Sequence, residues 1–316
     1  MLVRILMSIF CLSLAACGVD VEVDITDNDQ YTFREVTYPG ADFTEMVRIN
    51  NNGKALGRYK IDSYFEDSWG LFVYDIQQDT YQDIPLGDIE IGNTLFALDF
   101  NDLGDIVIHD FYPAFYSAAK NEFIVLPLPG EDHVDVRLKA INNTGKIAGY
   151  HFPPYGEQPR LKRGFIFDLE TLTYEYLNYP GALQTLFFAI NDNGYAVAQY
   201  FIDDESTAIA VYDMEQSQFM DIPRDTGNWQ VSDINNNNVI VVKTDKGDCV
   251  AGPTADDPCD YGYWLYSLEE DTLEKAKVPV SFASDTNNSL DFVGYSSVRY
   301  NREGVGEQKG AIGLRR

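Results

Sequence analysis

The stretch Ala189-Ile190-Asn191-Asp192-Asn193-Gly194 decides the fold, because related stretches recur along the whole chain. The first Asn of each copy is at position 50, 101, 142, 191, 235 or 287, so successive copies are 51, 41, 49, 44 and 52 residues apart. The copy at 287 is the most altered and reads Thr286-Asn287-Asn288-Ser289. Copies at roughly 40–50 residues are typical of a repeat architecture such as a β-propeller.

The repeat around Asn191 indicates four short strands. Residues 185–190 are apolar almost throughout, as a strand buried on both faces should be. Residues 191–194 predict a hairpin turn, because Asn and Gly tolerate positive φ and Asn caps its own backbone. Residues 195–201, 207–213 and 218–222 supply the other strands. The same four strands can be read in the other repeats, and no helical period extends beyond a turn. The prediction is an all-β, six-bladed β-propeller of four-stranded antiparallel blades.

The two ends of the repeat region complement each other. Residues 31–41 resemble residues 174–182, a fourth strand, but no blade precedes them. Residues 309–315 resemble a third strand with nothing after it. We therefore predict that Tyr31–Val36 pairs with the strand that ends at Leu314. This pairing would close the ring and remove its open edge.

Two motifs resemble a known family. Ile141-Asn-Asn-Thr-Gly-Lys-Ile-Ala-Gly149 and Tyr179-Pro-Gly-Ala182 are similar to the HAF repeats of bacterial extracellular proteins. The resemblance covers residues 31–316 and implies a propeller and an extracellular address, without catalytic residues or a settled activity. The His-Ala-Phe tripeptide that names the family is missing, because no His precedes Gly70, Gly164 or Gly262 at that point.

The first residues are typical of a secretory signal. Met1–Arg4 is basic and residues 5–16 form a short apolar run. Leu14-Ala15-Ala16-Cys17 resembles the lipobox of bacterial lipoproteins, which implies cleavage before Cys17 and lipidation of that residue. Gly18 stands where an Asp would resemble an inner-membrane retention signal, which points to the outer membrane, facing the periplasm or the exterior. The expected domains are a lipoprotein signal peptide at 1–16, a lipidated Cys and acidic tether at 17–30, and the propeller at 31–316.

Charge limits the partners. Removal of residues 1–16 takes Arg4 away and leaves 22 basic against 50 acidic residues, a formal net charge of −28. So acidic a protein repels nucleic acid and anionic lipid, and acidic partners are disfavoured. Contact with the membrane is expected through the lipid anchor only.

Two cysteines remain after the signal and the anchor are set aside. Cys249 and Cys259 are an even pair in an oxidising compartment, and we predict that they form a disulfide. The alternative is two free thiols.

The candidate binding face carries the second-to-third and fourth-to-first connections. Several of these are long and irregular, at 60–68, 151–162, 243–260 and 297–308, and function concentrates on such loops. Exposed aromatics there suit sugar faces and peptide segments, although the same rings could cover blade edges. The candidate residues are Tyr64, Phe65, Tyr112, Phe115, His133, His151, Tyr155, Trp229 and Tyr300.

Signals for a metal are weak, and no cofactor is expected. His109, His133 and His151 lack the close spacing of zinc ligands. Carboxylates around the cysteine pair could hold Ca²⁺, with a solvated acidic loop as the alternative; they are Asp248, Asp256, Asp257 and Asp260.

No motif for a serine nucleophile, a phosphate loop or a zinc protease occurs. The sequence therefore favours a ligand- or protein-binding module in the cell envelope, whose partner is a protein or a carbohydrate. One alternative is a glycosidase- or lyase-type enzyme with loop carboxylates at the propeller mouth, namely Glu66, Asp67, Asp110, Asp132 and Glu303. Another is a structural component of a surface assembly.

Overall fold

The computed structural model describes most of the chain after residue 20. The described ranges are 21–22, 27–61, 69–86, 96–109, 113–128, 135–153, 161–203, 207–223, 229–244, 262–278, 282–300 and 306–316. These residues are strands joined by turns, and they include no helix. Among them, no helical segment is long and apolar enough to cross a membrane.

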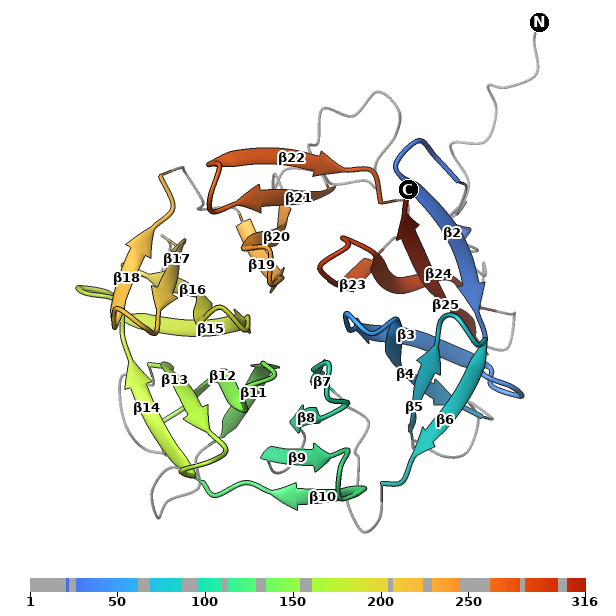
Figure 1. The fold of residues 1–316 in the computed structure, drawn as a ribbon, viewed down its shortest axis with the longest axis horizontal. Helices are drawn as coiled ribbons and strands as arrows, with labels where there is room; N and C mark the ends of the chain where they lie inside the picture. The colour runs from blue at the N-terminus through green and yellow to red at the C-terminus, as the bar shows by residue number, and fades with distance from the viewer. Residues whose placement is uncertain are drawn as a thin grey trace, which may run out of the picture.

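The strands are arranged as small antiparallel sheets around a central axis (Figure 1). Four sheets have four strands each, and a fifth has nine. The innermost strands are β3 (Phe43–Ile49), β7 (Phe96–Phe100), β11 (Val136–Ile141), β15 (Gln184–Ile190), β19 (Trp229–Ile234) and β23 (Phe282–Thr286). The second strands are β4 (Lys54–Lys60), β8 (Ile106–His109), β12 (Lys146–His151), β16 (Tyr195–Phe201), β20 (Val239–Thr244) and β24 (Phe292–Tyr300).

The third strands are β5 (Gly70–Asp75), β9 (Pro113–Ser117), β13 (Arg163–Asp168), β17 (Thr207–Asp213), β21 (Gly262–Ser267) and β25 (Gly306–Arg315). The outermost strands are β6 (Thr80–Ile84), β10 (Glu122–Val125), β14 (Thr173–Leu177), β18 (Gln218–Asp221), β22 (Thr272–Ala276) and β2 (Tyr31–Val36). The third and fourth strands predicted in the middle repeats are confirmed with nearly the same bounds.

The nine-stranded sheet contains the two ends of the repeat region. It consists of β3–β6, the group β23, β24, β25 and β2, and the two-residue strand β1 (Val21–Glu22), which pairs with β24. The predicted pairing is present: β2 runs antiparallel to β25, from Tyr31 opposite Arg315 to Val36 opposite Gly310. The two groups within the sheet meet through one parallel pair, Gln308 opposite Phe43.

Two expectations about the ends need correction. The connection expected at 297–308 is largely strand, since β24 continues to Tyr300 and β25 begins at Gly306. The described part of the expected tether contacts the body. Val21 lies opposite Val298, Asp27 forms an ion pair with Arg316 at 2.9 Å, and the side chain of Asn28 accepts a hydrogen bond from the backbone N–H of Tyr31 at 2.9 Å.

The hydrophobic core lies between neighbouring groups of strands. One cluster joins Leu56 and Leu71 to Phe100 and Ile106, and similar clusters follow around the axis. The last cluster packs Val36, Val293 and Ile312 against Met46 and Phe72, which lie on the first group. Apolar contact therefore continues across the join between the two ends of the chain.

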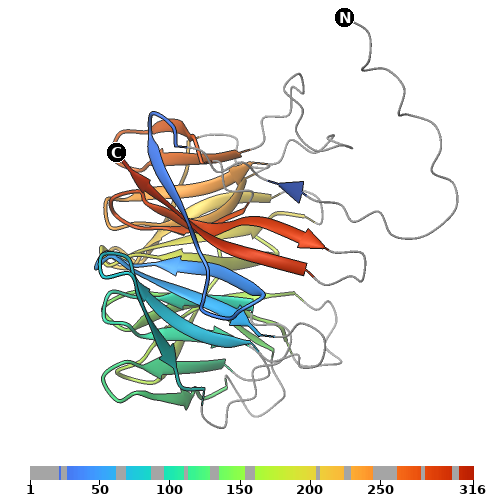
Figure 2. The ribbon, with the colours of Figure 1, turned by 90° about the vertical axis from the view of Figure 1, so that its right-hand side faces the viewer.

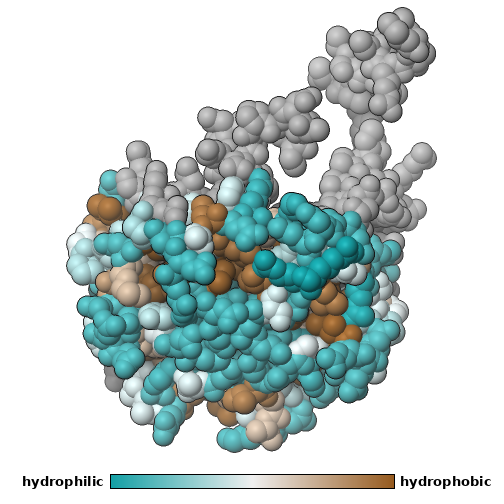
Figure 3. Space-filling model, turned by 45° about the horizontal axis from the view of Figure 1, so that its top comes forward, coloured by the Kyte–Doolittle hydropathy of each residue, from teal (hydrophilic) through white to brown (hydrophobic). Residues whose placement is uncertain are grey.

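The two faces of the ring differ. The turn face carries the first-to-second and third-to-fourth turns, and the loop face carries the other connections (Figure 2). In the first-to-second turns Gly53, Gly104, Gly145 and Gly194 have φ between 68° and 87°, a region that favours glycine. The positive φ predicted for these turns is confirmed there. In the hydropathy-coloured view, the surface on the turn side is largely hydrophilic (Figure 3).

Candidate functional site

The first Asn of each turn donates a hydrogen bond to the next repeat. Each side-chain Nδ2 reaches the backbone carbonyl of the first Asn in the following copy, and the last reaches the first. The links are Asn50 to Asn101 (3.3 Å), Asn101 to Asn142 (3.2 Å), Asn142 to Asn191 (3.0 Å), Asn191 to Asn235 (3.0 Å), Asn235 to Asn287 (3.3 Å) and Asn287 to Asn50 (3.5 Å). The amides thus form a closed ring, which we call the Asn ring.

The other end of each amide caps its own turn. In the repeat at Asn142, Oδ1 accepts from the backbone N–H of Thr144 at 3.1 Å and of Lys146 at 2.9 Å. The Asn191 side chain does the same for Asn193 at 3.1 Å and Tyr195 at 3.0 Å. The predicted capping of the Asn backbone is confirmed. The donation between repeats was not predicted, because nothing within one repeat indicates which neighbour its amide faces.

A second ring lies one residue further along. The backbone N–H at this position donates to the side-chain oxygen at the same position of the next copy. The links are Asn51 to Asp102 (2.7 Å), Asp102 to Asn143 (2.8 Å), Asn143 to Asp192 (2.7 Å), Asp192 to Asn236 (2.8 Å), Asn236 to Asn288 (2.7 Å) and Asn288 to Asn51 (2.8 Å). The two rings bind the polar groups of the turns to one another, so this Asn-rich pattern has a structural explanation.

A charged cluster lies behind the turns, two residues before the first Asn of each copy. This position follows a register shift between the innermost and second strands, and such a bulge re-aims the side chain next to it. It is occupied by Arg48, Asp99, Ala140, Ala189, Asp233 and Asp285. Three carboxyl groups and one guanidinium therefore face the axis, and two small residues leave space beside them.

Only part of this charge is neutralised. Arg48 Nε lies 3.1 Å from Asp99 Oδ1, and the other oxygen of Asp99 accepts the backbone N–H of Ile141 at 2.5 Å. Asp285 accepts the backbone N–H of Ile49 at 2.8 Å. Burial and the nearby Asp99 raise the pKa of Asp233 to about 7. Burial, with the charge of Asp233, also raises the pKa of Asp285.

A polar cavity of about 70 Å³ lies next to this cluster. Its lining includes Asp99, Asp233, Asp285 and the residues of both rings. A polar cavity of this size has room for a few water molecules. These carboxylates are at the turn-face end of the axis, and the sequence-based reasoning did not select them.

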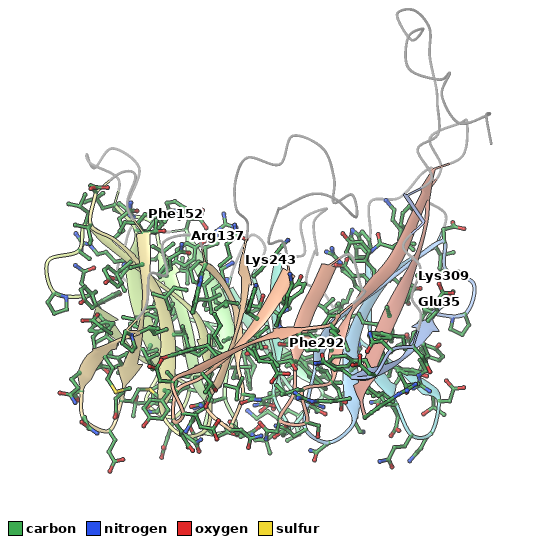
Figure 4. All side chains as sticks on the ribbon, turned by 90° about the horizontal axis from the view of Figure 1, so that it is seen from above. Glu35, Arg137, Phe152, Lys243, Phe292 and Lys309 are labelled. Carbon is green, nitrogen blue, oxygen red and sulfur yellow. The ribbon has the colours of Figure 1, made fainter. Side chains whose placement is uncertain are left out.

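A second charged cluster lies on the wall nearer the loop face, and we call it the basic wall. It consists of Arg137, Lys139 and Lys162 with the rings of Tyr150, Phe152 and Phe188, which are half-buried. Figure 4 shows Arg137 and Phe152 at the loop-face end, well away from the turns. Lys139 Nζ lies 5.6 Å from the Tyr150 ring centre and 5.7 Å from that of Phe188. Lys162 Nζ lies 5.6 Å from Tyr150 and 5.2 Å from Phe152.

The lysines of the basic wall are close to other cations. Burial lowers the pKa of Lys139 to about 8, and the charges of Arg48, Arg137 and Lys162 act in the same direction. Arg137 is paired with Asp135 at 2.8 Å. Within the part of the chain that the structure describes, neither Lys139 nor Lys162 has an acidic partner.

The predicted binding face is not confirmed where the structure describes it. Phe115 lies within β9 and packs on the core cluster around Val107. Trp229 begins β19, is 7% exposed and packs edge-on against Tyr266. His151 is also 7% exposed, with its ring 5.3 Å from that of Tyr176. Strand alternation buried these side chains, although they lie near strand ends. Tyr300 belongs to β24 and not to a loop.

Other predicted residues lie outside the described ranges. They are Cys17, Tyr64, Phe65, Tyr112, His133, Tyr155, Cys249, Cys259, Asp248, Asp256, Asp257 and Asp260. The disulfide, the lipidation site and the weak Ca²⁺ site therefore stay predictions. In the described ranges, no group of three or more His, Cys, Asp or Glu side chains is arranged to hold a metal ion.

Neither the family models nor the curated proteins include a match to this sequence. Similarity is found among solved structures. TolB from Acinetobacter baumannii superposes with a TM-score of 0.52 at 10% identity, over 86% of this chain and 63% of that one. The β-propeller domain of the Trilobed protease from Pyrococcus furiosus gives 0.51 at 12% identity, over 83% and 82%. The fold is that of a β-propeller.

The likeness shows the fold alone. This chain spans less than two thirds of TolB, and 41% of a prolyl endopeptidase that it matches with a TM-score of 0.50 at 10% identity. The resemblance to HAF repeats gains no support from these comparisons and stays a prediction.

Proposed function

We propose that this protein is a lipid-anchored, six-bladed β-propeller of the cell envelope that binds a protein partner with its loop face. The observation that carries the proposal is the asymmetry between the faces. The turn face uses its polar groups in two closed hydrogen-bonded rings. The loop-face end of the axis instead presents cations and half-buried rings to incoming molecules.

The blade count is supported by the rings. Each ring passes once through every copy of the repeat and returns to its start. In this arrangement the nine-stranded sheet comprises the first blade and the last blade. The last blade takes its outer strand from the N-terminal end, because β2 pairs with β25. Such closure removes two exposed strand edges.

The anchor is supported by the sequence Leu14-Ala-Ala-Cys17 and by the position of β1. This strand begins only four residues after Cys17 and pairs with the loop-face end of β24, at Ser297 and Val298. Four extended residues span roughly 14 Å. A lipid on Cys17 would therefore hold this edge of the loop face near the bilayer, and Gly18 favours the outer membrane.

Replacement of the anchor residue tests the attachment. We expect Cys17→Ser to move the protein from the membrane fraction to the soluble fraction and to abolish labelling by a fatty-acid analogue. Wild-type protein that takes up no label would overturn this part of the proposal.

The face that binds can be tested with photo-crosslinking residues at two equally exposed sites. Ile202, on the loop face, and Leu172, on the turn face, are each 57% exposed. We expect p-benzoylphenylalanine at position 202 to give discrete crosslinked products in intact cells, and the same residue at position 172 to give none. Products from position 172 alone would contradict binding at the loop face.

A further inference from the structure

We infer that the basic wall receives an acidic segment of a partner polypeptide, whose carboxylate lies between Lys139 and Lys162. The inference rests on the proposed binding at the loop face and adds the chemistry of the bound segment. It departs from the expectation that so acidic a protein disfavours acidic partners. That expectation came from the net charge, which does not show how charges are grouped.

The positions of the lysines are the first support. Their Nζ atoms both lie 5.6 Å from the centre of the same ring, that of Tyr150. A cation near an aromatic face is held there by the ring quadrupole. The two ammonium groups are thereby kept on either side of one residue, so a carboxylate that reaches Tyr150 can contact both.

The charge balance is the second support. Lys146, Lys277 and Lys309 are paired with Asp168, Asp29 and Glu35 at 2.6, 2.6 and 2.8 Å. Lys139 and Lys162 have no such carboxylate among the described residues, although the chain holds 50 acidic residues. Like charges brought together in a partly buried place repel one another. A bound carboxylate would relieve this repulsion.

The rings indicate which anion fits. The Tyr150 ring is tilted 65° from that of Phe152 and 52° from that of Phe188, with centres 6.0 and 6.1 Å apart. Rings at these angles form a niche for a bulky side chain and not a flat platform for a sugar ring. An acidic residue beside an aromatic one would place its carboxylate on the lysines and its neighbour against the rings.

Binding of designed peptides to the soluble protein, residues 19–316, tests the inference. The probe is a fluorescently labelled peptide that alternates Glu and Phe, and the reference peptide alternates Gln and Phe. We expect the Glu peptide to bind at least tenfold more tightly. Its affinity should fall at least tenfold in Lys139→Gln/Lys162→Gln and stay unchanged in Lys146→Gln, whose ammonium is paired with Asp168 at the turn-face end of β12. The Gln peptide should not distinguish the double variant from wild type.

A second measurement uses the wild-type protein and so avoids any loss of folding. A carboxylate at this site should keep Lys139 protonated, and a protonated amine is not acylated. We expect the Glu peptide to slow acylation of Lys139 by an N-hydroxysuccinimide ester at pH 8 several-fold, and to leave Lys146 unaffected.

The outcomes separate the two proposals. Equal affinity for the Glu and Gln peptides, or equal acylation of Lys139 with and without the Glu peptide, would overturn the acidic segment. Binding of oligogalacturonate at these lysines without binding of the Glu peptide would also overturn it, in favour of an acidic polysaccharide. Crosslinking at position 202 would still support the loop face in either case.

Discussion

The first Asn of each turn uses both ends of its amide, which explains why this residue type occupies the position in every copy. A side chain with only acceptor groups could cap its own turn but could not donate to the next repeat. One with only donor groups could not cap the turn. The Asn at the next-but-one position has a lesser role: where Asn52 donates to the carbonyl of Asp102 at 2.8 Å, other copies have Leu103, Thr144 or Ser289.

This difference gives a matched pair of variants. We expect Asn142→Ala to lower the free energy of unfolding by about 2–4 kcal/mol, because it leaves two buried N–H groups and one carbonyl without partners. Asn52→Ala should cost less than about 1 kcal/mol, since it removes one exposed bond. Urea titration followed by tryptophan fluorescence measures both. Similar, small losses would show that the Asn ring does not stabilise the fold.

The axial carboxylates predict a pH dependence. Burial raises the pKa of Asp233 to about 7, and the pKa of Asp285 and Asp99 is also raised, while an unfolded Asp titrates near 3.8. Between about pH 4 and pH 7 the folded protein therefore binds more protons than the unfolded chain, and its stability falls as the pH rises.

The variant Asp233→Asn isolates this effect from that of the other acidic residues. It removes one of the raised groups and the charge that raises Asp285. We expect the melting temperature of the variant to fall less than that of wild type between pH 5 and pH 8, as measured by differential scanning calorimetry. Parallel curves for the two proteins would mean that Asp233 is ionised throughout this range.

At the level of elements, β2 is the strand on which the last group of strands depends. It pairs with β25 over six residues and buries Tyr31 and Val36 to 1% and 2% exposure. β1 has only two paired residues. Residues 27–30 lie between them and contact the body, so the boundary between dispensable and necessary residues falls near Asp27.

Two truncations of the soluble protein locate this boundary. A chain that begins at Asp27 should melt within a few degrees of one that begins at Val19, because only the β1 pairing is lost. A chain that begins at Gly40 should lose several kcal/mol, a large part of the stability of an ordinary domain, and should aggregate through the edge of β25. Calorimetry and size-exclusion chromatography measure the two effects. Equal melting temperatures for both truncations would show that closure does not require β2.

For the whole molecule, charge is the dominant imbalance. The mature protein has a formal net charge of −28, and such self-repulsion destabilises a compact state. Its described ion pairs are few, and several are exposed. Exposed pairs contribute little.

Salt should therefore stabilise this protein. We expect the melting temperature to rise as NaCl increases from 10 to 500 mM, because screening weakens repulsion between distant charges more than it weakens the short, partly buried pairs. A melting temperature that falls over this range would mean that attractive pairs outweigh the repulsion.

The sequence alone determined the local architecture. A repeated turn motif with apolar strands on either side sets strand order, hairpin type and the need for an outer strand from the N-terminal end. These features depend on neighbours in the chain or on residue type. The pairing of Tyr31–Val36 was predictable for the same reason, since the two ends each lack what the other has.

Only the tertiary structure decided what the repeats form together. Arg48, Asp99, Asp233 and Asp285 are far apart in the chain and meet because the ring brings equivalent positions to one axis. Lys139 and Lys162 share a ring for the same reason. The position of Trp229 and His151 in the core also required the fold, because a residue at a strand end faces solvent or core according to a register that one residue changes.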